Sequence, residues 1–388
     1  MHEIYCLNNI SHVGTDLLGE GYQLTDELSQ ASGILVRSAN MHEFEFNRTL
    51  RAIARAGAGV NNIPVDRCTE QGIVVFNTPG ANANAVKELV LCSLFLGSRG
   101  IVDGIAWCRE NADDPNIGKS AEKAKKAFAG NEIKGKKLGV IGLGAIGAQV
   151  ANAALDLGME VLGYDPYVSV SAAWLIASKV KHIADLDEIF RTCDYISVHV
   201  PALPDTVGMV GERTLSLVKP GVVVLNFSRD TLVDAAAMTA ALEDGRVKRY
   251  ITDFATPDVM KMKNAIVLPH LGASSEEAED NCAVMAVQQI TDYIDNGNIT
   301  NSVNFPNCHL GVAPANGCRI ALLHKNTPGM LTQITTILGE EGLNIENLTN
   351  KAKKDAAFTL IDLAERPSDA AYERLDTIEG MYRVRDVK

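Results

Sequence analysis

The sequence lacks features that would assign it to several classes of protein. It has 36 Lys and Arg against 48 Asp and Glu, a formal net charge of -12. Nucleic-acid binding requires clustered cations, so this deficit argues against a nucleic-acid partner. No apolar run reaches the roughly 18 residues of a membrane span, and the start "MHEIYCLNN" does not resemble a signal peptide. We therefore expect a cytoplasmic protein with no membrane partner.

The eight cysteines contain no Cys-x-x-Cys pair. Most of them stand in apolar runs such as "LVLCSLFLG". This placement predicts buried free thiols in a reducing compartment rather than a disulfide framework. We also expect no bound metal.

Apolar strand-like runs and helical stretches alternate through most of the 388 residues. "KLGVIGLG", "YISVHVP" and "GVVVLNFSR" are examples of the strands. This alternation predicts an α/β fold with two doubly wound parallel-sheet domains of the Rossmann or flavodoxin-like kind. The stretch "AVKELVLCSLFLGSRGIVDGIAWCRE" is predicted to be one long helix.

The end of the chain departs from this alternation. "FPNCHLGVAPANGC" contains two prolines and two glycines and is typical of a linker. The residues after it predict the order β-α-β-β-α-β, a ferredoxin-like domain. The predicted division is a first domain over 1–90 and 277–305, a second over 91–276, a linker over 306–316 and a small domain over 317–388.

The motif Gly142-x-Gly144-x-x-Gly147 follows a predicted strand and opens a predicted helix. The first glycine permits a tight turn, the second lets the backbone approach a pyrophosphate, and the third lets the helix pack closely. Asp165 ends the next strand, where its carboxylate accepts hydrogen bonds from ribose hydroxyls and repels a 2′-phosphate. The motif therefore indicates NAD rather than NADP. The alternative is a glycine turn without a ligand.

Arg229 and His270 each follow an apolar strand, in "VVLNFSRD" and "IVLPHLG". The carboxyl ends of parallel strands are where such sheets bind ligands. An arginine fork grips a carboxylate, and a neutral histidine accepts a hydroxyl proton as a hydride leaves the same carbon. Taken singly, each residue is as readily structural. Together with the glycine turn they favour a dehydrogenase.

The glycine turn, "NFSRD", "TDF" and "PHLGAS", in that order, resemble the D-2-hydroxyacid dehydrogenases over about residues 33–305. The resemblance implies that Arg229 binds and polarises the substrate and that His270 is the general acid and base. It also implies closure of a cleft between the two larger domains. Further NAD contacts are implied for Thr78, Ala145, Ile146, Val200, Ser228, Asp253 and Gly272.

One position departs from the family pattern. The family has a glutamate a few residues after the position of Asp253, which pairs with the histidine and raises its pKa. Here "DFATPDVMKMKNAIVLPH" contains no glutamate, and counting without a gap puts Asp258 at that place. Either Asp258 replaces the glutamate with one methylene less reach, or no carboxylate pairs with the histidine.

The stretch "HKNTPGMLTQITTILGEEGLNI" resembles an ACT domain, a small-molecule sensor. A D-2-hydroxyacid dehydrogenase with such a tail implies reversible oxidation of 3-phospho-D-glycerate to 3-phosphooxypyruvate, the first step of L-serine biosynthesis. The substrate is then expected at Arg37, Ser38 and Asn82. Lys87 either adds charge there or is an exposed helix residue.

His324, Asn326 and Asn344 match ACT positions that hold serine. They predict a homodimer or homotetramer that binds L-serine as an effector, the alternative being a purely structural dimerisation domain. Two other functions remain open. One is a dehydrogenase of another D-2-hydroxy acid, such as lactate, glycerate or 2-hydroxyglutarate. The other is an NAD-sensing binding protein on the same fold.

Overall fold

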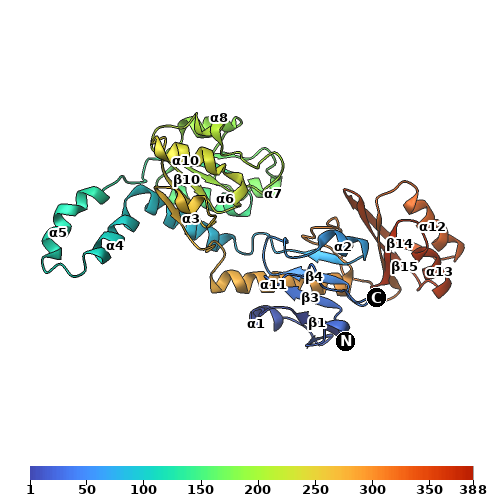
Figure 1. Ribbon diagram of the computed structural model, residues 1–388. Coiled ribbons are helices and arrows are strands. Elements are labelled where there is room, and N and C mark those ends of the chain that lie inside the picture. The colour runs from blue at the N-terminus through green and yellow to red at the C-terminus, as the bar shows by residue number, and fades with distance from the viewer. Residues whose placement is uncertain (388) are drawn as a thin grey trace. The chain divides into compact units, whose positions relative to one another are not determined.

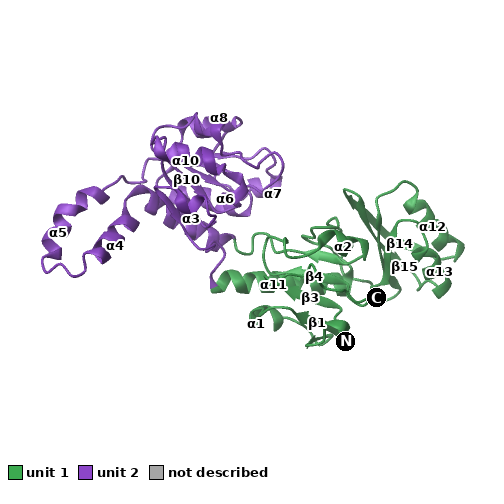
Figure 2. Cartoon of the chain, viewed as in Figure 1, with its two compact units in different colours: residues 1–82, 276–388 green, residues 83–275 purple. Residues whose placement is uncertain are grey.

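The computed structural model describes residues 1–387. They form two compact units, one of Met1–Asn82 with Glu276–Lys388 and one of Ala83–Ser275, green and purple in Figure 2. The first boundary falls earlier than the predicted 90/91, because helix α3 (Ala83–Ser98) packs through Val86, Val90 and Leu94 into the core of the second unit. The tail belongs to the first unit, whereas the sequence predicts that the tail forms a domain of its own.

The second unit is built on a seven-stranded parallel sheet in the order β12-β11-β10-β9-β6-β7-β8. Alternate residues of β10 enter the two cores on opposite faces, Val222 and Val224 on one and Val223 and Leu225 on the other. Burial on both faces explains the continuous apolar runs in the sequence. The strands are β6 (Lys137–Ile141), β7 (Glu160–Tyr164), β8 (Lys181–His182), β9 (Tyr195–Val198), β10 (Val222–Asn226), β11 (Val247–Thr252) and β12 (Ala265–Val267).

Helices cover this sheet, apart from an arm of two helices that projects from it (Figure 1). The arm is formed by α4 (Ile101–Glu110) and α5 (Ile117–Ala124), which bury none of their residues. The other helices are α6 (Ala145–Asp156), α7 (Val170–Ala173), α8 (Leu186–Thr192), α9 (Glu212–Leu215) and α10 (Ala235–Glu243). Short 3-10 turns are η2 (Lys125–Phe128), η3 (Asp230–Leu232) and η4 (Val259–Lys261).

The prediction of one long helix up to residue 110 is wrong. The helix ends at Ser98 and restarts at Ile101 with a bend of 70°. The carbonyl of Ser98 accepts bonds from the Asn131 backbone N–H (3.1 Å) and from Lys248 Nζ (3.0 Å). These distant partners hold the end of α3, and Gly100 begins the new direction as the N-cap of α4.

The first unit contains a five-stranded parallel sheet in the order β2-β1-β3-β4-β5. Helix α11 (Glu276–Asn296) returns from the end of the second unit and packs on this sheet through Ala286, Ile290 and Tyr293. The strands are β1 (His2–Cys6), β2 (Tyr22–Thr25), β3 (Gly33–Val36), β4 (Ala52–Arg55) and β5 (Val74–Phe76). The remaining elements are α1 (His12–Thr15), η1 (Leu28–Gln30) and α2 (Val65–Glu70).

The tail confirms the predicted β-α-β-β-α-β order, with an antiparallel sheet in the order β14-β15-β13-β16. One face of this sheet packs on its own helices, and the other shares a core with the first sheet and α11. The elements are β13 (Cys318–Lys325), α12 (Met330–Glu340), β14 (Ile345–Lys353), β15 (Ala356–Leu363), α13 (Asp369–Asp376) and β16 (Met381–Asp386). The predicted fold class is thus confirmed, although the tail shares its core with the first sheet.

A buried arginine explains why the tail belongs to the first unit. Arg319 is 1% exposed, and its Nε and Nη2 donate to the two carboxylate oxygens of Asp362. Its Nη1 donates to the carbonyl of Asn296 at the end of α11 (3.0 Å), and the linker carbonyls of Leu310 and Gly311 accept the rest. A buried charge held this completely fixes the tail to α11 and the linker.

Across residues 1–387 no single helix is long and apolar enough to cross a membrane, although the bent pair α3–α4 meets the length and composition criteria together. The cysteines are free thiols, but Cys92 and Cys108 are exposed, so their predicted burial is wrong.

Candidate active site

The glycine turn lies at the point of the second sheet where the strand order reverses, between β6 and β9. Gly142 has a φ of 91°, and a Cβ on it would lie 2.5 Å from the carbonyl oxygen of His199. A Cβ on Gly147 would lie 1.9 Å from the carbonyl oxygen of Gly142. Gly144 is different, because a Cβ there would meet nothing within 4 Å. Gly142 and Gly147 are therefore required by the packing of the protein itself, whereas the space beside Gly144 is open.

The helix after this turn begins without a side-chain cap. Gly144 is the N-cap of α6 and makes no side-chain bond to its first turn, where Ala145 and Ile146 lie. The backbone N–H groups of a first helical turn have no partner within the helix and attract anions. Asp165 lies beside them, since its Oδ2 accepts from the Leu143 N–H and its Oδ1 from the Tyr167 N–H, both at 2.8 Å. The acid is thus held against the glycine turn.

The loops after β9 and β10 are fixed to each other. Val200 lies two residues beyond β9, and Ser228 Oγ donates to the carbonyl of Val198 at 2.7 Å. Asn226 Nδ2 donates to the carbonyl of Arg229 at 2.8 Å. The Arg229 side chain is exposed, and no carboxylate within residues 1–387 forms an ion pair with it. Its Nη1 donates to the carbonyl of Ser228 at 2.5 Å, and its other donors are available to an anionic ligand.

Asp253, at the end of β11, is 2% exposed and reaches the loop after β12. Its Oδ2 accepts from the Gly272 N–H at 2.8 Å, and its backbone carbonyl accepts from the His270 N–H at 3.0 Å. Its Oδ1 is buried and has no hydrogen-bond partner in the described part of the chain. A buried oxygen without a donor is rare and points to a ligand that supplies one.

His270 has a φ of 49°, in the left-handed region that is uncommon for a non-glycine residue. Its ring is exposed and packs edge-on against Phe254, with ring centroids 5.3 Å apart and planes at 75°. Residues in such sparsely populated conformations concentrate at functional sites. The histidine is therefore held at the carboxyl edge of the sheet with its ring accessible.

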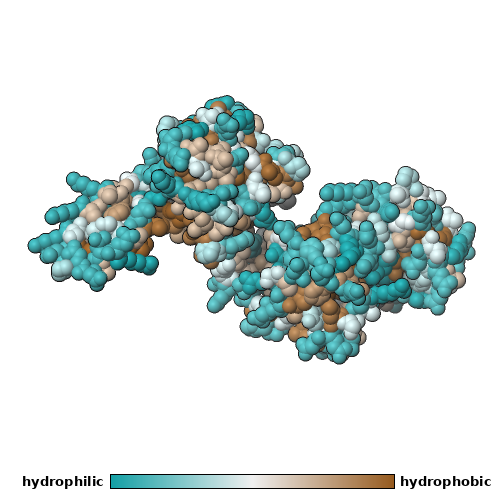
Figure 3. All heavy atoms as spheres, viewed as in Figure 1, coloured by the Kyte–Doolittle hydropathy of each residue, from teal (hydrophilic) through white to brown (hydrophobic). Residues whose placement is uncertain are grey.

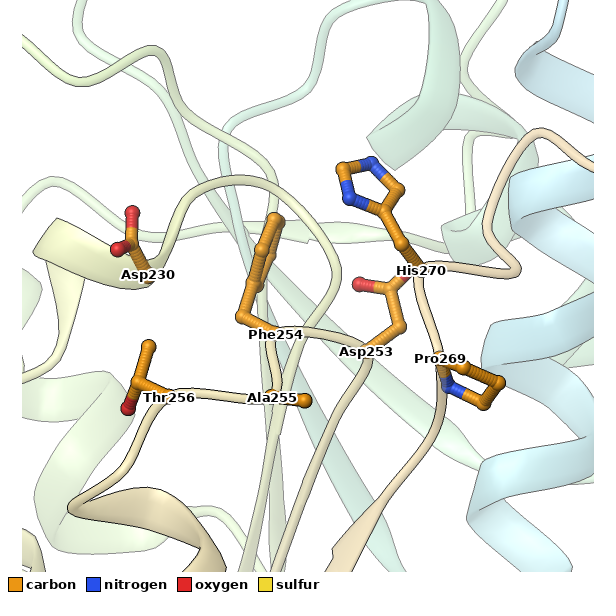
Figure 4. A pocket seen from close by; sticks show the side chains of 7 residues that line it. All are labelled: Asp230, Asp253, Phe254, Ala255, Thr256, Pro269 and His270. Atoms are coloured by element: carbon orange, nitrogen blue, oxygen red, sulfur yellow. The ribbon is translucent and has the colours of Figure 1, made fainter.

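The second unit has an open hollow of about 320 Å³ beside this histidine (Figure 4). It is lined by residues that lie after three neighbouring strands, β10, β11 and β12. The lining residues are Asp230, Asp253, Phe254, Ala255, Thr256, Pro269 and His270.

The structure does not bring Asp258 to the histidine. Its side chain is 76% exposed, does not line the hollow, and has Lys261 Nζ at 3.8 Å. The reason is the short turn η4, which begins directly after Asp258 and leads the chain along the surface towards β12. Counting residues without a gap ignores this turn.

The predicted substrate residues of the first unit lie at the carboxyl edge of its sheet. Asn8 Oδ1 accepts from the backbone N–H groups of Arg37, Ser38 and Ala39 at 2.9, 3.0 and 3.1 Å. The Arg37 guanidinium forms an ion pair with Glu279 of α11 at 2.6 Å, and both side chains are about half-buried. The loop after β3 is therefore held in place, with its arginine already partly neutralised.

Thr78, Asn82 and Lys87 were predicted from the segment after β5. Thr78 is fully buried and its backbone N–H donates to the carbonyl of Gly57 at 3.1 Å. Asn82 is the last residue of the first unit before the boundary. Lys87 belongs to the second unit on α3, where its Nζ donates to Asn84 Oδ1.

The tail residues differ in accessibility. His324 is 2% exposed, its Nδ1 lies 2.8 Å from the carbonyl of Lys325, and its Nε2 lies 2.8 Å from Thr359 Oγ1. Burial lowers the pKa of this imidazole. Asn326 and Asn344 are exposed, the first beside the turn into α12 and the second directly before β14. The structure thus leaves the two asparagines accessible and encloses the histidine.

Four residues at these sites were missed by sequence reasoning. Asn8 holds the loop of Arg37 and Ser38, and Arg55 ends β4, where its Nε donates to the carbonyl of Arg37 at 2.9 Å. Asp230 and Phe254 line the hollow beside His270. Arg55 and Asp230 had a visible signal, because each is a charged residue at the end of a buried strand, in "AIAR" and "NFSRD".

Residues 94–272 match the family described as D-isomer specific 2-hydroxyacid dehydrogenase, NAD binding domain. The uncapped start of α6, the open side of Gly144 and the unpartnered Asp253 oxygen all fit such a dinucleotide. The chain belongs to the D-2-hydroxyacid dehydrogenase family, and its NAD-binding domain is the one predicted from the glycine motif.

Within that family the chain is similar to D-3-phosphoglycerate dehydrogenases. It is 32% identical to that of Escherichia coli K12 over 94% of this chain and 88% of the relative. The corresponding rat protein is 34% identical over 73% of this chain and 52% of the relative. The structure resembles an NAD⁺-bound 3-phosphoglycerate dehydrogenase from Entamoeba histolytica, with a TM-score of 0.62 and 25% identity over 78% of this chain and 98% of that one. An apo D-lactate dehydrogenase from Escherichia coli shares the fold, with a TM-score of 0.61, 22% identity and coverage of 78% and 100%.

Proposed function

We propose that the protein oxidises 3-phospho-D-glycerate reversibly to 3-phosphooxypyruvate with NAD, as the first step of L-serine biosynthesis. The similarity to D-3-phosphoglycerate dehydrogenases across most of the chain is the observation that carries this proposal. The reaction removes a hydride from C2 and a proton from the C2 hydroxyl. Each part of that transfer has a candidate group at the carboxyl edge of the second sheet.

Arg229 and His270 are the proposed catalytic residues. The guanidinium of Arg229 holds the substrate carboxylate and polarises the C2 oxygen with its planar fork of donors. The neutral imidazole of His270 takes the hydroxyl proton during oxidation and returns it during reduction. The accessibility of both side chains supports these roles.

The cofactor residues follow from the features that fit a dinucleotide. Bound NAD supplies the acceptor for the hydride. The backbone of Ala145 and Ile146, with Gly144, receives the pyrophosphate, and Asp165 binds the adenosine ribose. Asp253 accepts a hydrogen bond from the nicotinamide amide through its unpartnered Oδ1. Contacts from Thr78, Val200, Ser228 and Gly272 complete the proposed set.

Arg37 and Arg55 are the proposed cations for the anionic substrate. They follow the neighbouring strands β3 and β4, and Val36 pairs with Arg55 in that ladder. Two arginines at adjacent strand ends match the geometry and charge of a phosphate better than one. Ser38 and Asn82 add hydrogen bonds, and Lys87 adds charge.

The tail is proposed to be an ACT domain that binds L-serine between two subunits. Its ferredoxin-like order and the exposed Asn326 and Asn344 support this. Strand β14 is an edge of the tail sheet and carries no buried residue, so it is available to pair with a second copy. His324 contributes indirectly, because its ring is already bonded inside the sheet. Serine inhibits only if it binds the slow state more tightly than the active one.

A homo-oligomer is also supported by the arm of the second unit. Val102 and Ile105 of α4 are 39% and 50% exposed, and no residue of α4 or α5 is buried. White, tan and brown atoms lie among the teal ones on this arm (Figure 3). Helices that bury nothing within their own chain gain stability when a partner covers their apolar side chains.

The phosphate is the part of the substrate that separates this proposal from related ones. We expect kcat/KM for 3-phospho-D-glycerate to exceed that for D-glycerate by ~100-fold or more, the scale of losing a charged group from a site that binds it. Arg55→Ala should narrow that ratio by raising KM for the phosphorylated acid alone. Equal kcat/KM for both acids in the unaltered protein would refute the proposed substrate while leaving the family assignment intact.

A further inference from the structure

The general base of this chain lacks the carboxylate that its family provides. An imidazole that takes a proton becomes a cation, and a nearby carboxylate stabilises that cation and raises the pKa. The sequence offers only Asp258 at the expected position, and the structure places Asp258 on the surface with Lys261. Either another carboxylate stabilises the protonated ring of His270, or no carboxylate does.

The hollow beside His270 contains two carboxylates, Asp230 and Asp253, and no other charged side chain lines it. Asp253 is already engaged, because its Oδ2 binds the Gly272 N–H and its Oδ1 is the buried oxygen assigned to the cofactor. Asp230 reaches the hollow from a different element, as the first residue of η3 directly after Arg229. Asp230 is exposed and forms no ion pair within residues 1–387.

The ring of Phe254 stands between Asp230 and His270 in Figure 4. It contacts the imidazole edge-on at a centroid distance of 5.3 Å, which fixes the orientation of the histidine. An aromatic ring also excludes water from the space that it occupies. A carboxylate and an imidazolium that line the same hollow attract each other.

We propose that the carboxylate of Asp230 stabilises the protonated ring of His270, in place of the missing glutamate. Asp230 is a positioning residue that acts through its charge across the hollow and not by direct contact, while Phe254 sets the angle of the ring. The inference rests on the proposed function only in taking His270 as the base. The competing explanation is that Asp230 is a solvated acid in the first turn of η3.

The negative charge of Asp230 favours the imidazolium form of His270 over the neutral ring, and Asp230→Asn removes that charge. Oxidation requires the neutral imidazole, and its rate rises as the imidazolium loses its proton. The acidic limb of kcat/KM should therefore move to lower pH in this variant.

The experiment compares pH profiles of kcat/KM for the unaltered protein, Asp230→Asn and Asp258→Asn. The same variants are titrated by NMR through the ring protons of His270, assigned with His270→Ala. We expect Asp230→Asn to move both the limb and the His270 titration downward, and Asp258→Asn to move neither. A shift in Asp258→Asn alone would assign the role to Asp258 and overturn the proposal, and no shift in either variant would overturn it as well.

The NMR titration keeps the two proposals separate. If the protein turns over no 2-hydroxy acid but the His270 titration still responds to Asp230→Asn, the proposed function fails and the coupling stands. If turnover is normal and the titration is unmoved, the coupling fails and the function stands. Circular dichroism checks that Asp230→Asn remains folded, as expected for an exposed side chain.

Discussion

Asp165 Oδ2 accepts a hydrogen bond from the backbone N–H of Leu143 at 2.8 Å. This bond joins the end of β7 to the glycine turn after β6, so one carboxylate serves both the turn and the proposed ribose contact. We expect NAD to bind far more tightly than NADP, because the carboxylate repels a 2′-phosphate.

Asp165→Ser removes that repulsion and should narrow the difference between the two Kd values, measured by quenching of protein fluorescence. Because the Leu143 N–H loses its acceptor, the variant should also bind NAD more weakly than the unaltered protein does. Equal affinity of the unaltered protein for NAD and NADP would contradict the assignment of Asp165.

Gly144 and Gly147 form a matched pair for testing where the cofactor lies. Gly147→Ala places a Cβ 1.9 Å from the carbonyl oxygen of Gly142, so it should lower the Tm of the protein without ligand. Gly144→Ala meets nothing within 4 Å and should leave that Tm nearly unchanged. It should nevertheless weaken NAD binding, because the space beside it is the proposed place of the pyrophosphate. Unchanged NAD affinity in Gly144→Ala would put the pyrophosphate elsewhere.

His199 should make the protein sensitive to acid. Burial lowers the pKa of this imidazole to about 4, and its Nδ1 has no partner in the described chain. Between the ordinary histidine pKa of about 6.5 and that value, the unfolded state binds the proton and the folded state does not, so stability falls as pH falls. His199→Asn should flatten the decline of Tm over this interval. An equally steep decline in the variant would show that other groups cause it.

The serine site is tested through Asn344, which is exposed and precedes edge strand β14. We expect L-serine to bind in calorimetry and to inhibit turnover, and Asn344→Ala to lose both effects while remaining folded. Glu341→Ala, an exposed neighbour outside the proposed site, is the control and should keep them. If millimolar L-serine neither binds nor inhibits the unaltered protein, the tail has no serine-sensing role.

The fold class was predictable because strands buried on both faces leave continuous apolar runs. Strand β10 is an example, with every residue of "VVVLN" buried. The bend after Ser98 was not predictable, because Asn131 and Lys248, which hold the Ser98 carbonyl, are far away in the sequence. The docking of the tail likewise depends on the bonds of Arg319 to Asn296, Leu310 and Gly311, which no local pattern reveals.

The candidate site was predictable where a residue lies at or shortly after the end of a strand. Asp253 directly follows β11 and Arg229 lies three residues beyond β10, so the strands fix where both residues lie. The position of Asp258 was not predictable, because it lies beyond the strand in a loop whose path is set by η4. The burial of His324 depends on Thr359, a partner from another strand, and its accessibility was therefore not readable from the motif.

In the proposed reaction 3-phospho-D-glycerate gives its C2 hydride to NAD, with Arg229 and His270 as the catalytic residues. The direct measurement is NADH formation, followed by its absorbance, with a panel of 3-phospho-D-glycerate, D-glycerate, D-lactate and D-2-hydroxyglutarate. We predict turnover with the phosphorylated acid above all others, and a fall in kcat of ~100-fold or more in His270→Ala, the scale of losing a general base. Arg229→Ala should lower kcat and raise KM together. Absence of NADH with every acid, or full activity of His270→Ala, would contradict the proposed reaction.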